Sequence, residues 1–158
     1  LVTNQLNHER VALVSAQPIF LALNGVREWA QNTKDGHGRR LIDSEWVQLN
    51  LARVHAKAEV LKLINWELAS ATDATPSPAD ASAAKVYGTE LATEAYRLLM
   101  EVLGTAATLR TDSPRALLRG RIERMHRSCL ILTFGGGTNE IQRDIIGMVA
   151  LGLPHASR

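Results

Sequence analysis

Hydrophobic side chains recur at every third or fourth position over most of the chain, the spacing that places them on one face of an α-helix. In the first segment, about 3–33, this face comprises Val2, Leu6, Leu13, Ala16, Phe20 and Leu23. Pro18 lies inside the segment and is expected to kink the helix, because proline has no backbone N–H to donate. The sequence "DGHGRR" at 35–40 contains two glycines and is expected to end this helix.

A second helix is predicted to begin at Asp43 or Ser44, since either side chain can cap a helix N-terminus. Its apolar face comprises Val47, Leu51, Val54, Ala58, Leu61 and Leu68. The low-complexity stretch 69–82 contains two prolines and interrupts the helical pattern. We therefore interpret this stretch as a loop without a chemical role.

A third helix, about 80–102, is predicted to stop at Gly104, and its apolar face comprises Ala84, Leu91, Ala95, Leu98 and Val102. A fourth helix is predicted to start at "TDSP" (111–114), with proline in its first turn. Its inner face comprises Leu118, Ile122, Met125, Cys129 and Leu132. A short fifth helix follows the glycines at 135–137 and ends at "GLP" (152–154). This order predicts an all-α fold, an antiparallel four-helix bundle with a short fifth helix.

The composition is that of one globular domain. The chain has 158 residues, of which 46% are hydrophobic, and no apolar run approaches the roughly 18 residues that a membrane span needs. The sequence opens on Leu1 without a targeting pattern, so we interpret it as a fragment with functional parts upstream. Its single cysteine, Cys129, excludes an internal disulfide and favours a reducing compartment.

The net charge is only +2, but positive charge is concentrated in the predicted fourth helix. The cluster comprises Arg115, Arg119, Arg121, Arg124 and Arg127. These positions do not share one direction on a helix, so we interpret them as a solvated basic surface. No aromatic residue that could stack on a base lies between them, which disfavours a nucleic-acid site. The five histidines show no pair with the spacing of a helical zinc site, so no metal site is predicted.

Glu9 interrupts the apolar face of the first helix, because it lies three residues after Leu6 and four before Leu13. Burial of a carboxylate disfavours its charged form, so its pKa would rise toward the value that a general base needs. The structural alternative is that Glu9 pairs with His8 or Arg10 near the positive end of the helix. The pattern alone favours this structural alternative.

The stretch "TFGGGTNEIQRD" at 133–144 allows two readings as well. Three consecutive glycines let backbone N–H groups approach a ligand, and the next helix, starting at Thr138 or Asn139, offers further donors to an anion. The alternative is a tight helix–helix connection in which Asn139 and Gln142 form a capping box.

The longer stretch "TFGGGTNEIQRDIIG" resembles the C-terminal signature of the FAD-dependent acyl-CoA dehydrogenases, and the resemblance extends over nearly the whole chain. It implies that residues 1–158 form the C-terminal helical bundle domain, with the upstream helical and β domains absent from this sequence. Most of the family carries a catalytic glutamate directly before a Gly-Thr pair, where this chain has Gly136. In a minority branch that includes isovaleryl-CoA dehydrogenase, the base lies instead in a first-helix segment similar to "LNHERVAL" (6–13). Glu9 matches that base, so the resemblance favours a catalytic role for Glu9 over the structural alternative.

The resemblance implies α,β-dehydrogenation of an acyl-CoA thioester to the enoyl-CoA, with FAD as cofactor and an electron-transfer flavoprotein-like acceptor. Glu9 would remove the α-proton, and the backbone N–H of Gly136 would stabilise the developing enolate oxygen. Asn7 and Arg10 match family positions that contact the CoA part of the substrate. The positions that match FAD contacts are Thr138, Asn139 and Glu140.

The chain departs from the family pattern at positions that reach the FAD of a neighbouring subunit. Lys34 and His37 stand where the family has Arg and Phe, and in "EVLGTA" (101–106) Glu101 and Thr105 replace a Gln and a Gly. A carboxylate at position 101 would repel a pyrophosphate. We therefore expect a heteromeric α2β2 enzyme in which this chain supplies the base and a related acyl-CoA dehydrogenase subunit supplies the missing contacts.

Such pairing resembles the heteromeric steroid side-chain acyl-CoA dehydrogenases of actinobacteria, so a bulky steroid acyl-CoA is the expected substrate and the bacterial cytoplasm the expected location. The residues also allow two other functions. Gly136 taken alone favours a catalytically silent structural subunit, which Glu9 opposes. A nucleic-acid-binding bundle built on the basic fourth helix is disfavoured by the missing aromatic residues.

Overall fold

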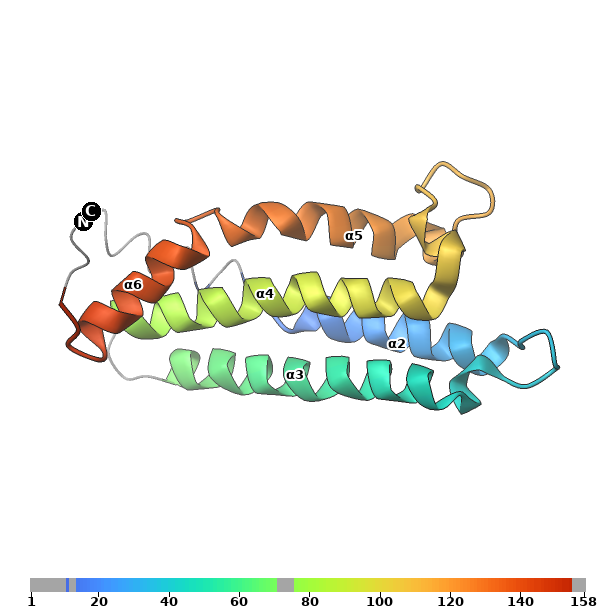
Figure 1. Cartoon of the computed structure of the whole chain (residues 1–158), viewed down its shortest axis with the longest axis horizontal. Helices are drawn as coiled ribbons and strands as arrows, with labels where there is room; N and C mark the ends of the chain where they lie inside the picture. Colours follow the sequence, from blue (N-terminus) through green and yellow to red (C-terminus); the bar gives the residue numbers. More distant parts are fainter. Residues whose placement is uncertain (1–10, 12–13, 71–75, 155–158) are drawn as a thin grey trace.

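The computed structural model describes residue 11, residues 14–70 and residues 76–154. The helices are α2 (Gln17–Asn32), α3 (Glu45–Ser70), α4 (Pro78–Leu103), α5 (Arg121–Cys129) and α6 (Asn139–Val149). Short 3-10 turns are η1 (Leu41–Asp43), η2 (Gly104–Thr108), η3 (Leu117–Gly120) and η4 (Leu130–Thr133). Helices α2 to α5 lie lengthwise in one bundle, consecutive helices run in opposite directions, and α6 crosses the end where α4 begins (Figure 1). The predicted antiparallel all-α bundle is confirmed.

Helix α4 occupies the centre of the bundle, and the other helices bury their apolar faces against it. Its predicted apolar residues Ala84, Leu91, Ala95, Leu98 and Val102 are all buried. The hydroxyl of Ser77 caps its N-terminus, and Gly104 ends it with a positive φ of 71°. The third predicted helix is therefore confirmed, with a start at Pro78.

Small residues on α4 allow close packing against its neighbours. A Cβ atom on Gly88 would lie 2.5 Å from the Cβ of Val14, a distance that real Cβ contacts do not reach. Val14 precedes α2 and is buried. The absence of a side chain at Gly88 thus lets the segment before α2 lie directly on α4.

Helix α2 begins later than predicted, at Gln17, and residues 14–16 are not helical. The prediction of one helix kinked at Pro18 is therefore wrong in the part of the chain that the structure describes. Pro18 lies in the first turn of α2, where a missing backbone N–H costs no helical hydrogen bond. Phe20 is only half-buried, and the buried face of α2 comprises Ile19, Ala22, Leu23, Val26 and Ala30.

Helix α3 buries five of its six predicted apolar residues, whereas Leu68 is half-buried. The carboxylate of Asp43 forms an ion pair with Arg40 at 2.8 Å, and Ser44 is the residue directly before the helix. A second set of apolar side chains on α3 is exposed, with fractions of 45–62%. This exposed set comprises Trp46, Leu49, Val60, Leu63 and Trp66.

The predicted start of the fourth helix at 111–114 is wrong. Residues 111–116 form turns, η3 follows, and α5 begins at Arg121. Leu118, Arg119 and Gly120 have positive φ values of 49°, 56° and 65°, which a right-handed helix does not tolerate. A Cβ atom on Gly120 would lie 2.6 Å from the backbone N of Thr111, so the returning chain occupies the space where a side chain would stand.

Among the described helices, none combines the length and the apolarity needed to cross a membrane. The described residues likewise contain no group of three or more His, Cys, Asp and Glu side chains placed to hold a metal ion.

Candidate functional site

The glycines at 135–137 form a turn between η4 and α6, and two of them have positive φ values. Gly136 has a φ of 68° and Gly137 a φ of 100°. The N–H of Gly135 donates to the carbonyl of Ile131 at 3.0 Å, and the N–H of Gly137 donates to the carbonyl of Phe134 at 3.2 Å. A Cβ atom on Gly137 would lie 2.7 Å from Nε2 of Gln142. The turn therefore requires glycine at 137, by conformation and by space.

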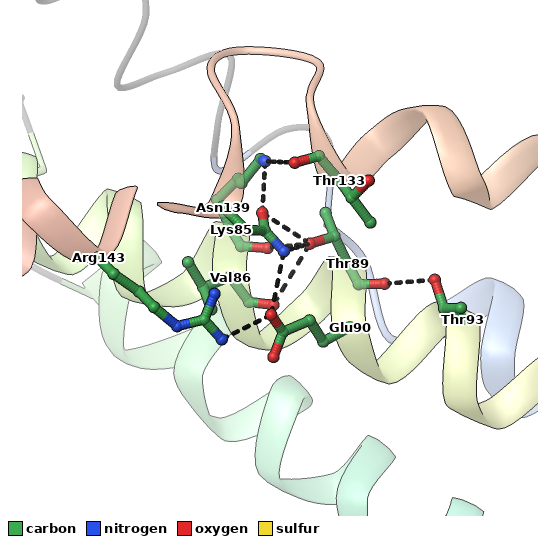
Figure 2. Close-up of polar contacts among 8 residues, drawn as sticks. All are labelled: Lys85, Val86, Thr89, Glu90, Thr93, Thr133, Asn139 and Arg143. Atoms are coloured by element: carbon green, nitrogen blue, oxygen red, sulfur yellow. Dashed lines mark hydrogen bonds and ion pairs between the residues drawn. The ribbon is translucent and has the colours of Figure 1, made fainter. Parts of the chain in front are cut away.

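Lys85 of α4 lies beneath this turn and is fully buried. Figure 2 shows its ammonium group between Thr133 and Asn139. It donates to the carbonyl oxygens of Thr133 at 3.0 Å and Gly137 at 2.8 Å, and to Oδ1 of Asn139 at 2.6 Å. One side chain of α4 thus joins both ends of the glycine turn and the start of α6.

Asn139 opens α6 with its side chain directed inward, and the residue is 5% exposed. Besides accepting from Lys85, it donates through Nδ2 to Thr89 at 3.1 Å and to Glu90 at 3.2 Å. Glu90 also pairs with Arg143 of α6 at 2.6 Å (Figure 2). These contacts fix the first turn of α6 on α4.

The capping box of Asn139 and Gln142 is not formed, so that prediction is wrong. The cap is Thr138, whose hydroxyl accepts from the N–H of Ile141 at 3.4 Å. Gln142 is buried and donates instead to the carbonyl of Gly136 at 3.2 Å, while its Oε1 accepts from Ser82 at 2.8 Å. The side chain of Gln142 therefore supports the turn from inside the protein.

Thr138 and Glu140 are exposed at the start of α6. The carboxylate of Glu140 accepts from its own backbone N–H and from Thr138, and these hydrogen bonds lower its pKa below the usual value. The first turn of a helix also favours negative charge. This outer face thus combines backbone donors with a carboxylate that stays charged.

The sequence prediction placed site residues in two segments, of which the structure describes one. Gly136, Thr138, Asn139 and Glu140 lie together at the turn between η4 and α6. The other predicted site residues, Asn7, Glu9 and Arg10, lie outside the described residues.

A cavity of about 440 Å³, which we call the α4–α5 cavity, lies between the segment before α2, helix α4 and helix α5. Its lining is mainly apolar and includes Val14, Gly88, Ala92, Tyr96, Cys129 and Leu132. Burial raises the pKa of Tyr96 to about 12 and also raises the pKa of the Cys129 thiol. Both groups are therefore neutral near pH 7, and the cavity suits an uncharged, bulky ligand.

The positions that depart from the family pattern lie at the far end of the bundle, opposite α6 (Figure 1). Lys34 and His37 are exposed on the loop between α2 and η1, which is organised by the carboxylate of Asp35. Glu101 forms an ion pair with Arg97 and accepts from Nδ2 of Asn50 at 3.2 Å. Its negative charge is therefore partly compensated within this chain.

The arginine cluster is exposed, as its interpretation as a solvated surface requires. Arg127 pairs with Glu123 at 2.9 Å, which lowers the pKa of that carboxyl. Arg119, Arg121 and Arg124 do line one cavity of about 460 Å³. The backbone reversal at η3 brings these three arginines together. Their directions could not be predicted from helical geometry, because the chain is not a regular helix there.

Lys85 was missed by the sequence prediction, although a signal for it was present. Ala81, Lys85 and Gly88 follow the helical spacing of four and three among small buried residues of the third helix. A charged lysine on a helix face of alanine and glycine breaks the apolar pattern, just as Glu9 breaks the pattern between Leu6 and Leu13. A charged residue within the apolar face of a predicted helix is the signal that marks both residues.

The comparisons with known proteins agree with this geometry. Residues 1–151 match the family model described as acyl-CoA dehydrogenase, C-terminal domain. The chain is 85% identical to acyl-CoA dehydrogenase FadE26 of Mycobacterium tuberculosis over 162 residues, which cover 100% of this chain and 40% of that protein.

Two solved structures share the fold closely. The crystal structure of the ChsE4-ChsE5 complex from Mycobacterium tuberculosis matches with a TM-score of 0.91 and 85% identity, over 99% of this chain and 40% of that one. The Tcur3481-Tcur3483 steroid ACAD matches with a TM-score of 0.89 and 37% identity, over 98% and 39%. The chain thus spans about 40% of the length of these relatives. By its sequence and its fold, the chain belongs to the acyl-CoA dehydrogenase family.

Proposed function

We propose that this chain is the base-bearing part of a FAD-dependent acyl-CoA dehydrogenase subunit, which converts an acyl-CoA thioester to its α,β-enoyl-CoA. The observation that carries the proposal is the glycine turn at 135–137, which is held from inside by Lys85 and Gln142 and carries no acidic side chain. A base must then come from another segment. Glu9, the carboxylate in the apolar face of the first segment, is the residue to which we assign that role.

In this proposal the carboxylate of Glu9 accepts the proton from the α-carbon of the thioester. Negative charge develops on the thioester oxygen, and the backbone N–H of Gly136 stabilises it. The missing side chain at Gly136 leaves space for the thioester. Asn7 and Arg10 are assigned to the CoA part, where a guanidinium suits a phosphate.

Bound FAD would supply the acceptor for the hydride that leaves the β-carbon. The residues assigned to hold it are Thr138, Asn139 and Glu140, at the N-terminus of an α6 helix of 11 residues. A helix N-terminus offers free N–H donors to an anionic group, and the adjacent glycines allow close approach. Because the side chain of Asn139 is bonded inward, we assign any flavin contact at this position to its backbone N–H.

The proposed substrate class is a bulky, uncharged acyl group such as a steroid side-chain thioester. The α4–α5 cavity supports this, since Val14 follows the segment that contains Glu9 and Leu132 precedes the glycine turn. A cavity of about 440 Å³ with a mainly apolar lining fits a large hydrophobic group. The 37% identity to a steroid acyl-CoA dehydrogenase complex supports the same class.

We further propose that the chain acts in an α2β2 heterotetramer with a related acyl-CoA dehydrogenase subunit and passes electrons to an electron-transfer flavoprotein-like acceptor. The substitutions at Lys34, His37, Glu101 and Thr105 support a partner that completes the second flavin contacts. The exposed apolar set on α3 supports a larger assembly, because an apolar helix face of that size is rarely left in water. One related structure is described as a complex of two proteins, ChsE4 and ChsE5, and a second carries two protein names, Tcur3481 and Tcur3483.

A catalytically silent structural subunit is the second candidate, and one observation favours it: the position that carries the base in most of the family is Gly136. The two candidates differ in whether Glu9 contributes to turnover. Substitution of Glu9 by glutamine therefore distinguishes them.

The proposal is tested by producing the full-length protein alone and together with its partner subunit. We expect FAD retention and dehydrogenation of a steroid acyl-CoA only in the joint preparation, with a lower kcat/KM for a short straight-chain acyl-CoA. Flavin absorbance per chain and reduction of an artificial electron acceptor measure the two properties. A fully flavinated, active homo-oligomer of this protein alone would contradict the heteromeric proposal.

A further inference from the structure

We propose that Lys85 is a positioning residue, whose buried ammonium group fixes both ends of the glycine turn. It thereby positions the N–H of Gly136, assigned to the thioester, and the N–H of Thr138, a residue assigned to the flavin. This inference rests on the proposed function, because it assigns Lys85 a role in that same site. Lys85 is fully buried, and its residue volume is the largest among the fully buried residues that the structure describes. Lys85 takes no direct part in the proposed transfer of the proton or the hydride.

Several carbonyl oxygens converge beneath the turn. The ammonium group of Lys85 donates to the oxygens of Thr133, Gly137 and Asn139 at 2.6–3.0 Å. Gln142 donates to the neighbouring carbonyl of Gly136 at 3.2 Å. Three backbone carbonyls around the turn therefore point inward, toward donors supplied by α4 and α6.

The inward direction of these carbonyls also sets the direction of the N–H groups in the same peptides. A trans peptide is planar, and its N–H points away from its C=O. Since the carbonyl of Gly137 points to Lys85, the N–H of Thr138 points away from the interior, toward the outer face of the turn. Lys85 thereby sets the orientation of the peptide that joins the turn to α6.

Burial of the Lys85 ammonium group has a cost in free energy. Burying an ammonium group is unfavourable unless hydrogen bonds replace its hydration, and an uncharged side chain of the same length would pack there at lower cost. The three acceptors match the three N–H donors of the ammonium group. The described hydrogen bonds of this ammonium group all go to one turn and the helix after it. The need to hold that turn best explains why a charge is buried there.

The consequence concerns kcat rather than substrate affinity. If Lys85 is replaced by Met, the turn keeps its sequence and the interior keeps its volume, but the carbonyls of Thr133 and Gly137 lose their donor. The turn then samples other peptide orientations. A donor misplaced by about 1 Å can cost on the order of 100-fold in rate.

The test compares Lys85→Met with the parent in the assembled full-length enzyme. Hydrogen–deuterium exchange of peptides spanning 134–138 is measured first, without substrate, and we expect exchange about tenfold faster or more in the variant, because opening of the turn is no longer opposed. Steady-state kinetics with acyl-CoA then should show kcat lowered by about 100-fold with KM nearly unchanged.

Thr93→Val is the matched control. Thr93 lies two turns further along α4, is partly buried, and donates to the carbonyl of Thr89 at 3.1 Å without contacting the glycine turn (Figure 2). We expect this control to leave exchange at 134–138 and the kinetic constants unchanged. Should Lys85→Met fail to fold, Lys85→Gln retains two N–H donors in place of three and is measured in the same way.

Unchanged exchange at 134–138 in a folded Lys85 variant would overturn the inference, as would a change confined to KM. The exchange measurement needs no substrate. An enzyme that oxidises no acyl-CoA would therefore refute the proposed function, while the exchange data would still decide the role of Lys85.

Discussion

Tyr96 shows how burial sets the chemistry of a single residue in the α4–α5 cavity. The residue is 2% exposed, and removal from water disfavours the phenolate, which raises the pKa to about 12. Cys129 lies close enough to raise it further, and Arg121 partly opposes the rise. The cavity therefore presents a neutral hydroxyl over the whole physiological pH range.

This pKa predicts a measurable pH dependence. Because the folded pKa of Tyr96 exceeds its ordinary value of 10.0, the stability that its burial contributes is fully present below that pH and is lost as pH rises through about 12. Phenolate absorbance of the parent minus that of Tyr96→Phe should show one titration step near pH 12. A difference spectrum with its midpoint near the ordinary value would contradict the burial of the hydroxyl.

Two residues of the site illustrate what the sequence could and could not predict. Gly136 lies in the glycine run that the sequence singled out, and Thr138 was one of two residues expected to start the next helix; Thr138 does cap α6. The inward direction of Asn139 was not predictable, because it depends on Lys85 and Thr89, which lie more than 45 positions earlier. Contacts between distant segments carry no local sequence signature.

At the scale of elements, the backbone conformation of the glycine turn between η4 and α6 is tightly constrained. Gly137 combines a φ of 100° with a Cβ position 2.7 Å from Gln142, and Gln142 cannot move aside easily because it is bonded to Ser82 and to Gly136. Gly135 has no positive φ, and a Cβ there would meet the carbonyl oxygen of Ile131 at an ordinary 3.5 Å.

These two glycines form a matched pair for mutation. Gly137→Ala should lower the free energy of unfolding by about 1–3 kcal/mol, because alanine is strained at positive φ and its Cβ displaces Gln142. Gly135→Ala should change it by less than about 0.5 kcal/mol. Denaturant unfolding of the full-length variants measures both. Equal effects of the two substitutions would show that the turn is not constrained as described.

The helices themselves differ in how well periodicity predicted them. The faces of α3 and α4 were predicted nearly residue by residue, because long helices average over local exceptions. The starts of α2 and α5 were both predicted wrongly at a proline: Pro18 lies at a helix start where a kink was predicted, and Pro114 does not start a helix where a start was predicted. Pro114 precedes three residues with positive φ rather than a helix, and the return of the chain at Thr111 and Gly120 imposes that path.

At the scale of the whole molecule, the bundle is organised along the length of α4. One end of α4 holds the glycine turn and α6 through Lys85, Thr89 and Glu90. The other end holds Glu101 beside Arg97 and Asn50, next to the turn that begins at Gly104. The residues proposed to serve this chain's own flavin site and those proposed to have lost contact with a neighbour's flavin thus lie at opposite ends of one helix.

This separation bears on the proposed heteromer. A loss of function at the far end, through Glu101 and Thr105, leaves the glycine turn unaffected because no described contact joins the two ends directly. One chain can therefore keep the residues of its own proposed site while losing those that would contact a neighbour's flavin.

The overall bundle was predictable from the sequence, whereas the exposed apolar set on α3 was not, since periodicity alone does not say which of two apolar faces is covered.

The central claim is that Glu9 is the catalytic base, and substitution by glutamine tests it most directly. Glu9→Gln retains the shape and the hydrogen-bonding capacity of the side chain but removes its ability to accept the α-proton. In the assembled enzyme with its partner, the rate of flavin reduction by acyl-CoA should fall by about 10²–10⁴-fold, the usual contribution of a general base, while FAD content and KM stay unchanged. Flavin reduction at the parent rate in Glu9→Gln would contradict the account and leave this chain as a structural subunit.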